Sequence, residues 1–258
     1  MVDRNPLLLT RRENLLAMVP GFILYALLAE SRAAAVPGRR SSSPARWIDG
    51  QHQIAQDLAA GRMTGIDWGL EVARLAKEVD VGELMALVQR SKITHGQPPG
   101  GTDPRKRYVN FLDEAGAPRK LAYGVALFEF EPGNVITPHG HKNMVSAHMV
   151  VNGTFRVRNF DRLHDEAGAM VIRPTRDYLA RAGDVSTMCS ERDNIHWFVP
   201  QQGVGTTFDV VISGLDPSMP EYEIKAVDPV RGRRLADGAI IAPVIDFAES
   251  SRLYTSQV

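Results

Sequence analysis

From Arg107 onward the hydrophobic pattern of the chain has a period of two, and this alternation limits the fold more than any other feature. Short apolar runs are separated by Gly, Pro and Asp residues that favour turns. Asn152-Gly153 joins two of these runs, and Asn-Gly between apolar strands is the strongest short hairpin signal. Many short strands of this kind predict an antiparallel sandwich or barrel. The expected strands are residues 108–112, 120–131, 144–151, 154–160, 170–172, 178–180, 185–188, 195–199 and 206–213.

Residues 47–92 carry helical periodicity instead and predict three helices. Asp80 followed by Glu83 is a variant of the capping box, so one helix is expected to begin there. A helical segment of this size rarely supports its own core. We therefore expect residues 47–106 to pack on a barrel formed by residues 107–258.

The first 35 residues differ from the rest and suggest an export signal. Arg11-Arg12 precedes an uncharged run, residues 15–29, which is short for a bilayer span of about 20 residues. Together with the small residues Ala33 and Ala35, the pattern resembles a twin-arginine signal peptide. It predicts a periplasmic or otherwise exported protein, with a linker at 36–46 and no stable membrane insertion after cleavage. The alternatives to a cleaved signal are a helix that belongs to the fold and an uncleaved membrane anchor.

Charge and cysteine content exclude several function classes. The chain has 30 basic and 30 acidic residues, so there is no excess positive field with which to bind nucleic acid. Cys189 is the single cysteine, which excludes a disulfide framework and a cysteine-based zinc site. It is expected to be a small buried hydrophobe. Composition leaves the oligomeric state open.

Four histidines fall in the strand-rich half of the chain: His139, His141, His148 and His196. Alternate residues of a strand share a face, so the imidazoles of His139 and His141 converge. With a third histidine from a neighbouring strand they can bind a divalent metal.

The surroundings of these histidines resemble the cupin family. Gly133, five further residues, His139-Gly140-His141 and the later Gly153 match its first motif, and Gly183 through Asn194-Ile195-His196 match its second. This resemblance, over roughly residues 107–215, implies a double-stranded β-helix barrel with His139, His141 and His196 as metal ligands.

One position departs from the common cupin pattern. Most metal cupins carry a glutamate five residues after the second histidine, where this chain has Ser146. His148 is two residues further, on the same face of a regular strand, so either three or four histidines bind the metal. Three neutral imidazoles leave the metal its full charge and leave positions open for a thiolate and O2.

A closer resemblance is to the thiol dioxygenases of the cysteamine dioxygenase and plant cysteine oxidase group. It rests on His139-x-His141-x-x-Met144, Asn194-Ile195-His196 and Phe208-Asp209-Val210. It implies an Fe(II) enzyme that oxidises a small thiol or related molecule with O2. The Pro-Pro-Tyr of that group is replaced by Ser-Gly-Leu-Asp-Pro at 213–217, so substrate handling is expected to differ.

Two other functions stay open. The first is a different metallo-cupin enzyme, such as a lyase, isomerase or hydrolase with Mn, Ni or Zn, which a fourth ligand at His148 would favour. The second is a barrel that binds a metal or a small molecule without turning it over.

Several further residues are candidates for the site. Asp209 either orients a histidine or is an exposed strand carboxylate. Tyr178 and Tyr123 either hydrogen-bond to O2 at the metal or pack in the barrel wall. Three arginines either anchor a substrate carboxylate or form the solvated face of strands: Arg156, Arg158 and Arg173.

Overall fold

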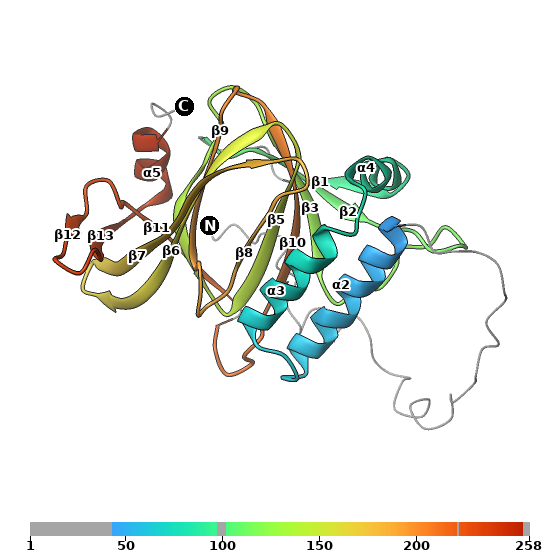
Figure 1. Ribbon diagram of the computed structural model, residues 1–258, viewed down its shortest axis with the longest axis horizontal. Helices are drawn as coiled ribbons and strands as arrows, with labels where there is room; N and C mark the ends of the chain where they lie inside the picture. Colours follow the sequence, from blue (N-terminus) through green and yellow to red (C-terminus); the bar gives the residue numbers. More distant parts are fainter. Residues whose placement is uncertain (1–42, 97–101, 221, 255–258) are drawn as a thin grey trace.

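The computed structural model describes residues 43–96, 102–220 and 222–254 (Figure 1). The expected signal peptide and most of the expected linker lie outside the described residues. The helices are α2 (Ser43–Ala59), α3 (Gly65–Ala76), α4 (Val81–Gln89) and α5 (Phe247–Tyr254). The strands are β1 (Lys92–His95), β2 (Arg105–Asn110), β3 (Gly124–Phe130), β4 (Ile136–Lys142), β5 (Met144–Asn152), β6 (Thr154–Glu166), β7 (Ala169–Arg181), β8 (Val185–Met188), β9 (Ile195–Pro200), β10 (Gly205–Ser213), β11 (Glu223–Val227), β12 (Arg233–Arg234) and β13 (Ile240–Ile245).

Two antiparallel sheets form the barrel, so the prediction of a mainly β, cupin-type barrel preceded by helices is confirmed. One sheet has the order β1-β2-β3-β10-β5-β8 and the other the order β11-β4-β9-β6-β7-β13-β12. The strand order is not the sequence order, because between β3 and β11 the chain crosses from one sheet to the other after every strand except β6, which pairs with β7. That alternation brings β4 beside β9 and β5 beside β10, although these pairs are far apart in the sequence.

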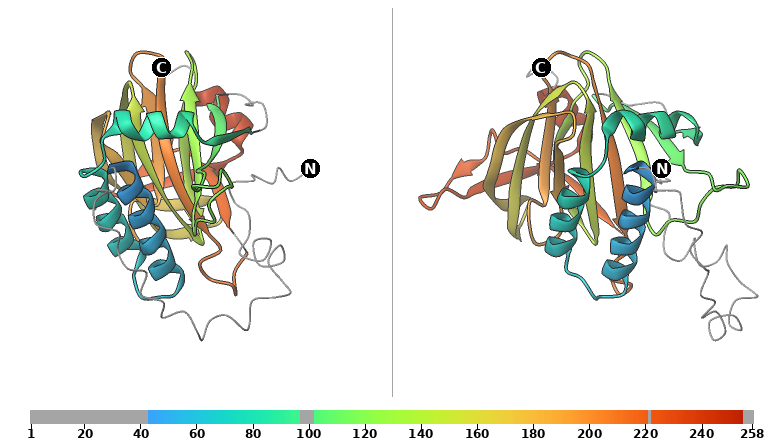
Figure 2. Two further views of the ribbon diagram at one scale, coloured as in Figure 1. Left: turned by 90° about the vertical axis from the view of Figure 1, so that its right-hand side faces the viewer. Right: turned by 45° about the vertical axis from the view of Figure 1, so that its right-hand side comes forward.

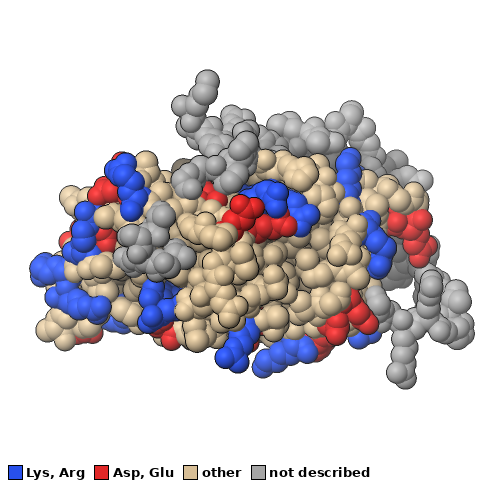
Figure 3. Space-filling view, turned by 90° about the horizontal axis from the view of Figure 1, so that it is seen from above, with Lys and Arg blue, Asp and Glu red and all other residues tan. Residues whose placement is uncertain are grey.

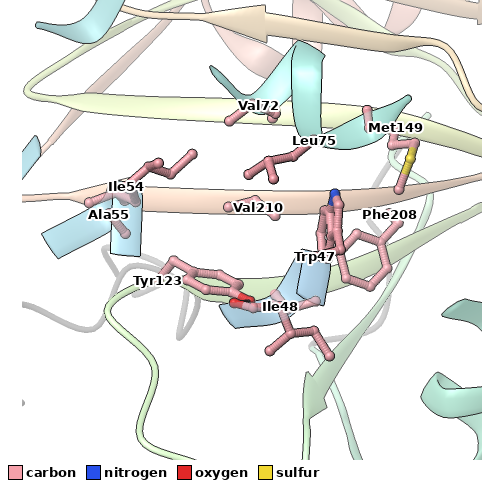
Figure 4. Packing of buried hydrophobic residues seen from close by; sticks show 14 of the residues in the cluster. Trp47, Ile48, Ile54, Ala55, Val72, Leu75, Tyr123, Met149, Phe208 and Val210 are labelled. Atoms are coloured by element: carbon pink, nitrogen blue, oxygen red, sulfur yellow. Dashed lines mark hydrogen bonds between the residues drawn. The ribbon is translucent and has the colours of Figure 1, made fainter. Parts of the chain in front are cut away.

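Helices α2 and α3 cover the outer face of the first sheet, and α4 lies beside α2 (Figure 2). Trp47 of α2 packs edge-on against Phe208 of β10, with ring centroids 5.2 Å apart (Figure 4). Ile54 of α2 and Leu75 of α3 belong to the same buried apolar cluster. As expected from its sequence, Asp80 caps the start of α4, and its side chain accepts a hydrogen bond from the backbone N–H of Glu83. The outward residues of β5 and β10 are therefore apolar, which leaves their inward residues free to carry polar groups.

The helical and strand boundaries differ from the predicted ones at several places. Helix α2 begins at Ser43, inside the expected linker, because Pro44 and Trp47 are buried in its first turns. Strand β1 and the start of β2 lie between the end of the helical periodicity at residue 92 and the first expected strand at residue 108, where no strand was predicted. The two short strands expected at 170–172 and 178–180 are one strand, β7, since its polar middle continues to pair with β6.

The C-terminal strands were not predicted. β11 pairs with both β4 and β13, and β13 pairs with β7, so the second sheet closes on itself. This closure buries a separate apolar cluster that contains Phe160, Ile172, Ile195 and Ile240. The outward face of β4, β6 and β9 is thus covered by the C-terminal part of the chain, as the helices cover the other sheet (Figure 1).

The surface carries both signs of charge. On the face seen in Figure 3, basic and acidic side chains surround a mostly uncharged central area. Within the described ranges, none of the helices combines the length and the apolar character that a membrane span needs.

Candidate metal centre

Three histidines converge inside the barrel. His139 and His141 come from β4, and His196 comes from the neighbouring strand β9, where it is paired in register with His139. One ring nitrogen from each lies within 4.8 Å of the other two. The Nε2 atoms of His139 and His196 are 3.1 Å apart. Two nitrogens bonded at about 2.1 Å to one ion, at right angles, are separated by about 3 Å, so this spacing fits a shared metal.

The hydrogen bonds of the His139 and His141 rings occupy Nδ1 and leave Nε2 available to bind a metal. The Nδ1 atom of His139 lies 2.7 Å from the carbonyl oxygen of Thr137, so Nδ1 carries the proton and Nε2 the lone pair. The Nδ1 atom of His141 lies 3.0 Å from the sulfur of Met144. Among the described residues, the buried Nε2 of His141 has no hydrogen-bond partner. A divalent metal fits this donor set, since a metal bond would satisfy that nitrogen.

The three rings are neutral at physiological pH. Burial lowers the pKa of His139 to about 4. Burial, reinforced by repulsion from the neighbouring histidines, also lowers the pKa values of His141 and His196 well below the usual range. Protons therefore compete weakly with a metal for these nitrogens.

The backbone around the histidines is held by Asn194. Its side-chain amide donates to the carbonyl oxygens of His141 and Cys189 at 2.7 and 3.1 Å, and its oxygen accepts from the N–H of His141 at 3.3 Å. A Cβ on Gly140 would lie 3.0 Å from that oxygen and 3.1 Å from Ile195. The glycine between the two histidines therefore lets β4 approach the β8–β9 loop closely. The sequence motifs contained both residues, but they did not indicate this contact.

His148 lies beside the cluster without belonging to it. Its Nδ1 is 2.6 Å from Oδ2 of Asp209, and its Nε2 is 2.9 Å from Oγ of Ser146. Asp209 therefore orients a histidine and is not an exposed strand carboxylate. The histidine that it orients is His148, which is not one of the three that converge. The His148 and His196 rings are 4.7 Å apart and meet edge to face.

The barrel interior is apolar on one side of the histidines and open on the other. Phe198 follows His196 by two residues on β9 and packs in an apolar cluster with Phe155 and Val150. Beyond His141 lies a cleft of about 560 Å³, lined by β4, β6 and the loops that follow β8 and β10. His141 itself lines this cleft. A small molecule that enters the cleft therefore meets a candidate ligand of the metal.

The two tyrosines lie in the barrel wall or outside it. Tyr178 of β7 packs against the apolar cluster of Phe155 and Phe198, and burial raises its pKa. Tyr123 is buried beneath α2, where its hydroxyl donates to the carbonyl oxygen of Ile48 at 3.2 Å. Cys189 is buried as expected, and burial raises the pKa of its thiol to about 12.

The three arginines considered as carboxylate anchors have other partners. Arg156 is paired with Asp177 at 2.8 Å, and Arg173 with Asp237 at 2.8 Å. Arg158 lies over the ring of Trp197, 3.9 Å from its centroid. The arginine that lines the cleft is Arg162, four residues after Arg158. Sequence reasoning missed it because the end of β6 shows no apolar alternation.

Comparisons with known proteins give structural similarity only. No family model and no curated protein matches the chain. Among solved structures, KdgF from a Halomonas species is 17% identical over 46% of this chain and 84% of its own, with a TM-score of 0.31. A predicted oxalate decarboxylase from Thermotoga maritima is 15% identical over 48% of this chain and 95% of its own, also with a TM-score of 0.31. A protein from Klebsiella pneumoniae with a double-stranded β-helix domain is 15% identical over 49% and 83%, with a TM-score of 0.31.

Proposed function

We propose that this protein is a metal-dependent cupin oxygenase that uses Fe(II) to oxidise a small thiol with O2. The observation that carries the proposal is the convergence of three neutral imidazoles, from His139, His141 and His196. Within the described part of the chain, that cluster contains no carboxylate. Such a set leaves a bound divalent ion its full charge and open positions for a thiolate and for O2.

Bound Fe(II) would lower the pKa of a coordinated thiol and provide the position at which O2 reacts. The overall reaction, R–SH with O2 to R–SO2H, places both oxygen atoms on sulfur and needs no further reductant. The carbonyl of Thr137 and the side chain of Asn194 hold the ligands in place. The apolar layer around Phe198 keeps water out on one side, so reactants enter from the cleft beyond His141.

The hydrogen bonds of His148 favour three ligands over four. Both of its nitrogens face partners within 2.9 Å, so binding a metal would require it to give up Asp209 or Ser146. This weakens the support for a four-histidine lyase, isomerase or hydrolase with Mn, Ni or Zn. Measuring O2 uptake distinguishes the oxygenase from a barrel that binds a metal without turnover.

The test is the metal content and O2 consumption of protein purified without oxygen. We expect near-stoichiometric iron, thiol-dependent O2 uptake, and loss of both in His139→Ala. His95→Ala is the matched control, because His95 is an exposed histidine of β1 that does not line the cleft, and it is expected to change neither. Bound metal without O2 uptake for any thiol would exclude the oxygenase, and failure to bind any metal would exclude a metalloprotein.

We also propose that the protein is exported through a twin-arginine signal. The support is the sequence pattern of residues 1–35. Replacing Arg11 and Arg12 together with lysine is expected to abolish export of the full chain, measured by fractionation. Export that is unchanged in this variant would contradict the proposal.

A further inference from the structure

The imidazole of His141 donates its Nδ1 proton to a methionine. The Nδ1 atom lies 3.0 Å from the sulfur of Met144, and among the described residues this sulfur is its hydrogen-bond partner. A thioether has lone pairs but no hydrogen to donate, so the proton of this pair lies on Nδ1. In the neutral ring the lone pair is then on Nε2, the nitrogen that faces the other two histidines. The sulfur therefore selects the tautomer of His141 that can bind a metal.

The acceptor of His141 differs in kind from the acceptor of His139. The Nδ1 atom of His139 faces the backbone carbonyl of Thr137, which stays in place whatever side chain that position carries. The sulfur of Met144 belongs to a side chain, so a single substitution removes it. Metal-binding histidines usually donate this proton to a carboxylate, a backbone carbonyl or water, and a thioether is a weaker acceptor than these.

The surroundings of the sulfur are largely apolar. Met144 is buried in a small cluster with Val211, Tyr222 and Ile224, and the His141 side chain is buried as well. Loss of the sulfur would leave a buried N–H without its acceptor, which is costly. The ring can relieve that cost by changing its tautomer or by rotating, and either change turns the lone pair of Nε2 away from the metal.

A single residue fixes the sulfur beside the ring. Strands β4 and β5 belong to different sheets, and the chain passes between them at Asn143. Asn143 has a φ of 59°, in the left-handed region that asparagine tolerates better than most residues. Its side chain donates to the carbonyl oxygens of Asp216 and Pro220, both at 2.9 Å, and accepts from the N–H of Asp216 at 2.7 Å. This corner is therefore locked, and the placement of Met144 against His141 does not depend on a loose loop.

The corner explains the spacing of three residues between the two side chains, because it returns the chain to the ring that it has just left. We propose that Met144 is a positioning residue of the metal centre, whose sulfur keeps the Nε2 atom of His141 turned toward the bound metal. This inference rests on the metal centre of the proposed function, but it does not depend on the oxidation of a thiol.

The experiment replaces the sulfur with an apolar group and with an amide. Met144→Leu nearly keeps the volume of the side chain and removes the acceptor, an exchange that cores tolerate well. Met144→Gln keeps an unbranched side chain and supplies a new acceptor, the amide oxygen. Met149→Leu is the matched control, because Met149 is equally buried in the same strand but packs in the cluster beneath the helices. Circular dichroism establishes that each full-length variant is folded.

Two properties of the Co(II)-loaded proteins are measured. The first is Co(II) affinity, and the second is the exchange with D2O of the ring N–H protons, whose NMR signals paramagnetic Co(II) shifts out of the main spectrum. We expect Met144→Leu to lower the affinity about tenfold and to speed the exchange of one ring N–H. Met144→Gln should restore the affinity to within a few-fold of the unchanged chain and slow that exchange again. Met149→Leu should change neither property.

A purely structural role for Met144 gives different results. Unchanged affinity and exchange in Met144→Leu, or a greater loss of affinity in Met144→Gln than in Met144→Leu, would mean that the site needs an apolar side chain and not an acceptor. Either result overturns the proposal, as does an equal loss of affinity in Met149→Leu. If Met144→Leu does not fold, Met144→Gln decides alone, since retained affinity supports the acceptor and lost affinity opposes it.

The outcomes also separate this proposal from the oxygenase. Cobalt results as expected, without O2 uptake by the Fe(II)-loaded chain for any thiol, would support Met144 and exclude the oxygenase. O2 uptake that is retained while Met144→Leu changes neither cobalt property would do the reverse. If the unchanged chain binds no Co(II), the role of Met144 is overturned together with the metal centre.

Discussion

Two walls of the barrel interior carry histidines, and the structure uses them differently. The ligand wall, formed by β4 and β9, presents His139, His141 and His196 with converging nitrogens. The opposite wall, formed by β5 and β10, presents His148 between Asp209 and Ser146. All four rings point inward, so facing the interior is not sufficient to make a histidine a metal ligand.

The difference lies in the partners of each ring. On the ligand wall the backbone carbonyl of Thr137 binds one nitrogen of His139 and leaves the other free. On the opposite wall a carboxylate and a hydroxyl occupy both nitrogens of His148. The hydrogen-bond partners of each ring therefore decide whether it can bind a metal.

The largest expected effect is on metal affinity, when one histidine of each wall is replaced in turn. His196→Ala is expected to weaken Co(II) affinity by about 100-fold or more, because it removes one of three ligands. His148→Gln should keep the affinity within a few-fold and the metal stoichiometry unchanged. Metal content and Co(II) titration measure both, with circular dichroism to establish folding. Loss of metal in His148→Gln, at an unchanged fold, would mean that the opposite wall supplies a fourth ligand.

The opposite wall should matter more for stability than for metal binding. Asp209 is fully buried and paired with His148 at 2.6 Å. Asp209→Ala is expected to lower the free energy of unfolding by about 3 kcal/mol, since it removes a buried charge-assisted hydrogen bond. Asp177→Ala, at an exposed pair, should cost less than about 1 kcal/mol. Urea denaturation of the metal-free proteins measures both, and equal costs would contradict the structural role of Asp209.

The ligand wall should also make the metal-free protein sensitive to acid. The pKa of His139 is lowered to about 4 by burial, whereas in the unfolded chain it is about 6.5. Between these values the unfolded state binds more protons, so stability is full above about pH 6.5 and falls as the pH drops towards 4. We expect His139 to account for about 1–2 kcal/mol of that loss by pH 5. His139→Leu should give a shallower pH dependence in urea denaturation, and an unchanged slope would contradict this origin.

The sequence allowed prediction of the barrel and of the pair His139 and His141 from local patterns, whereas His196 was expected only from the resemblance to the second cupin motif. Alternation along the strand puts His139 and His141 on one face, and the Asn-Gly turn after β5 sets the hairpin with β6. Ring closure by β11 and β13 could not be predicted, because short strands with weak alternation are recognisable only through their partners. The place of Arg162 could not be predicted either, since it depends on Asp165, Glu223 and a cleft formed by distant loops.

The smallest expected effect concerns how the ligand wall is held in place. Asn194 binds the backbone of His141 through two hydrogen bonds, so Asn194→Ala should weaken Co(II) affinity by about tenfold without removing a ligand. Asp228→Ala is the matched control, because Asp228 is equally buried but its side chain bonds to the N–H of Arg231 and the hydroxyl of Tyr254. Both variants lose buried hydrogen bonds, so both should be somewhat less stable, yet only the first disturbs a metal ligand. Equal losses of cobalt affinity in the two variants would mean that general packing holds the ligand wall, and not the contact between Asn194 and His141.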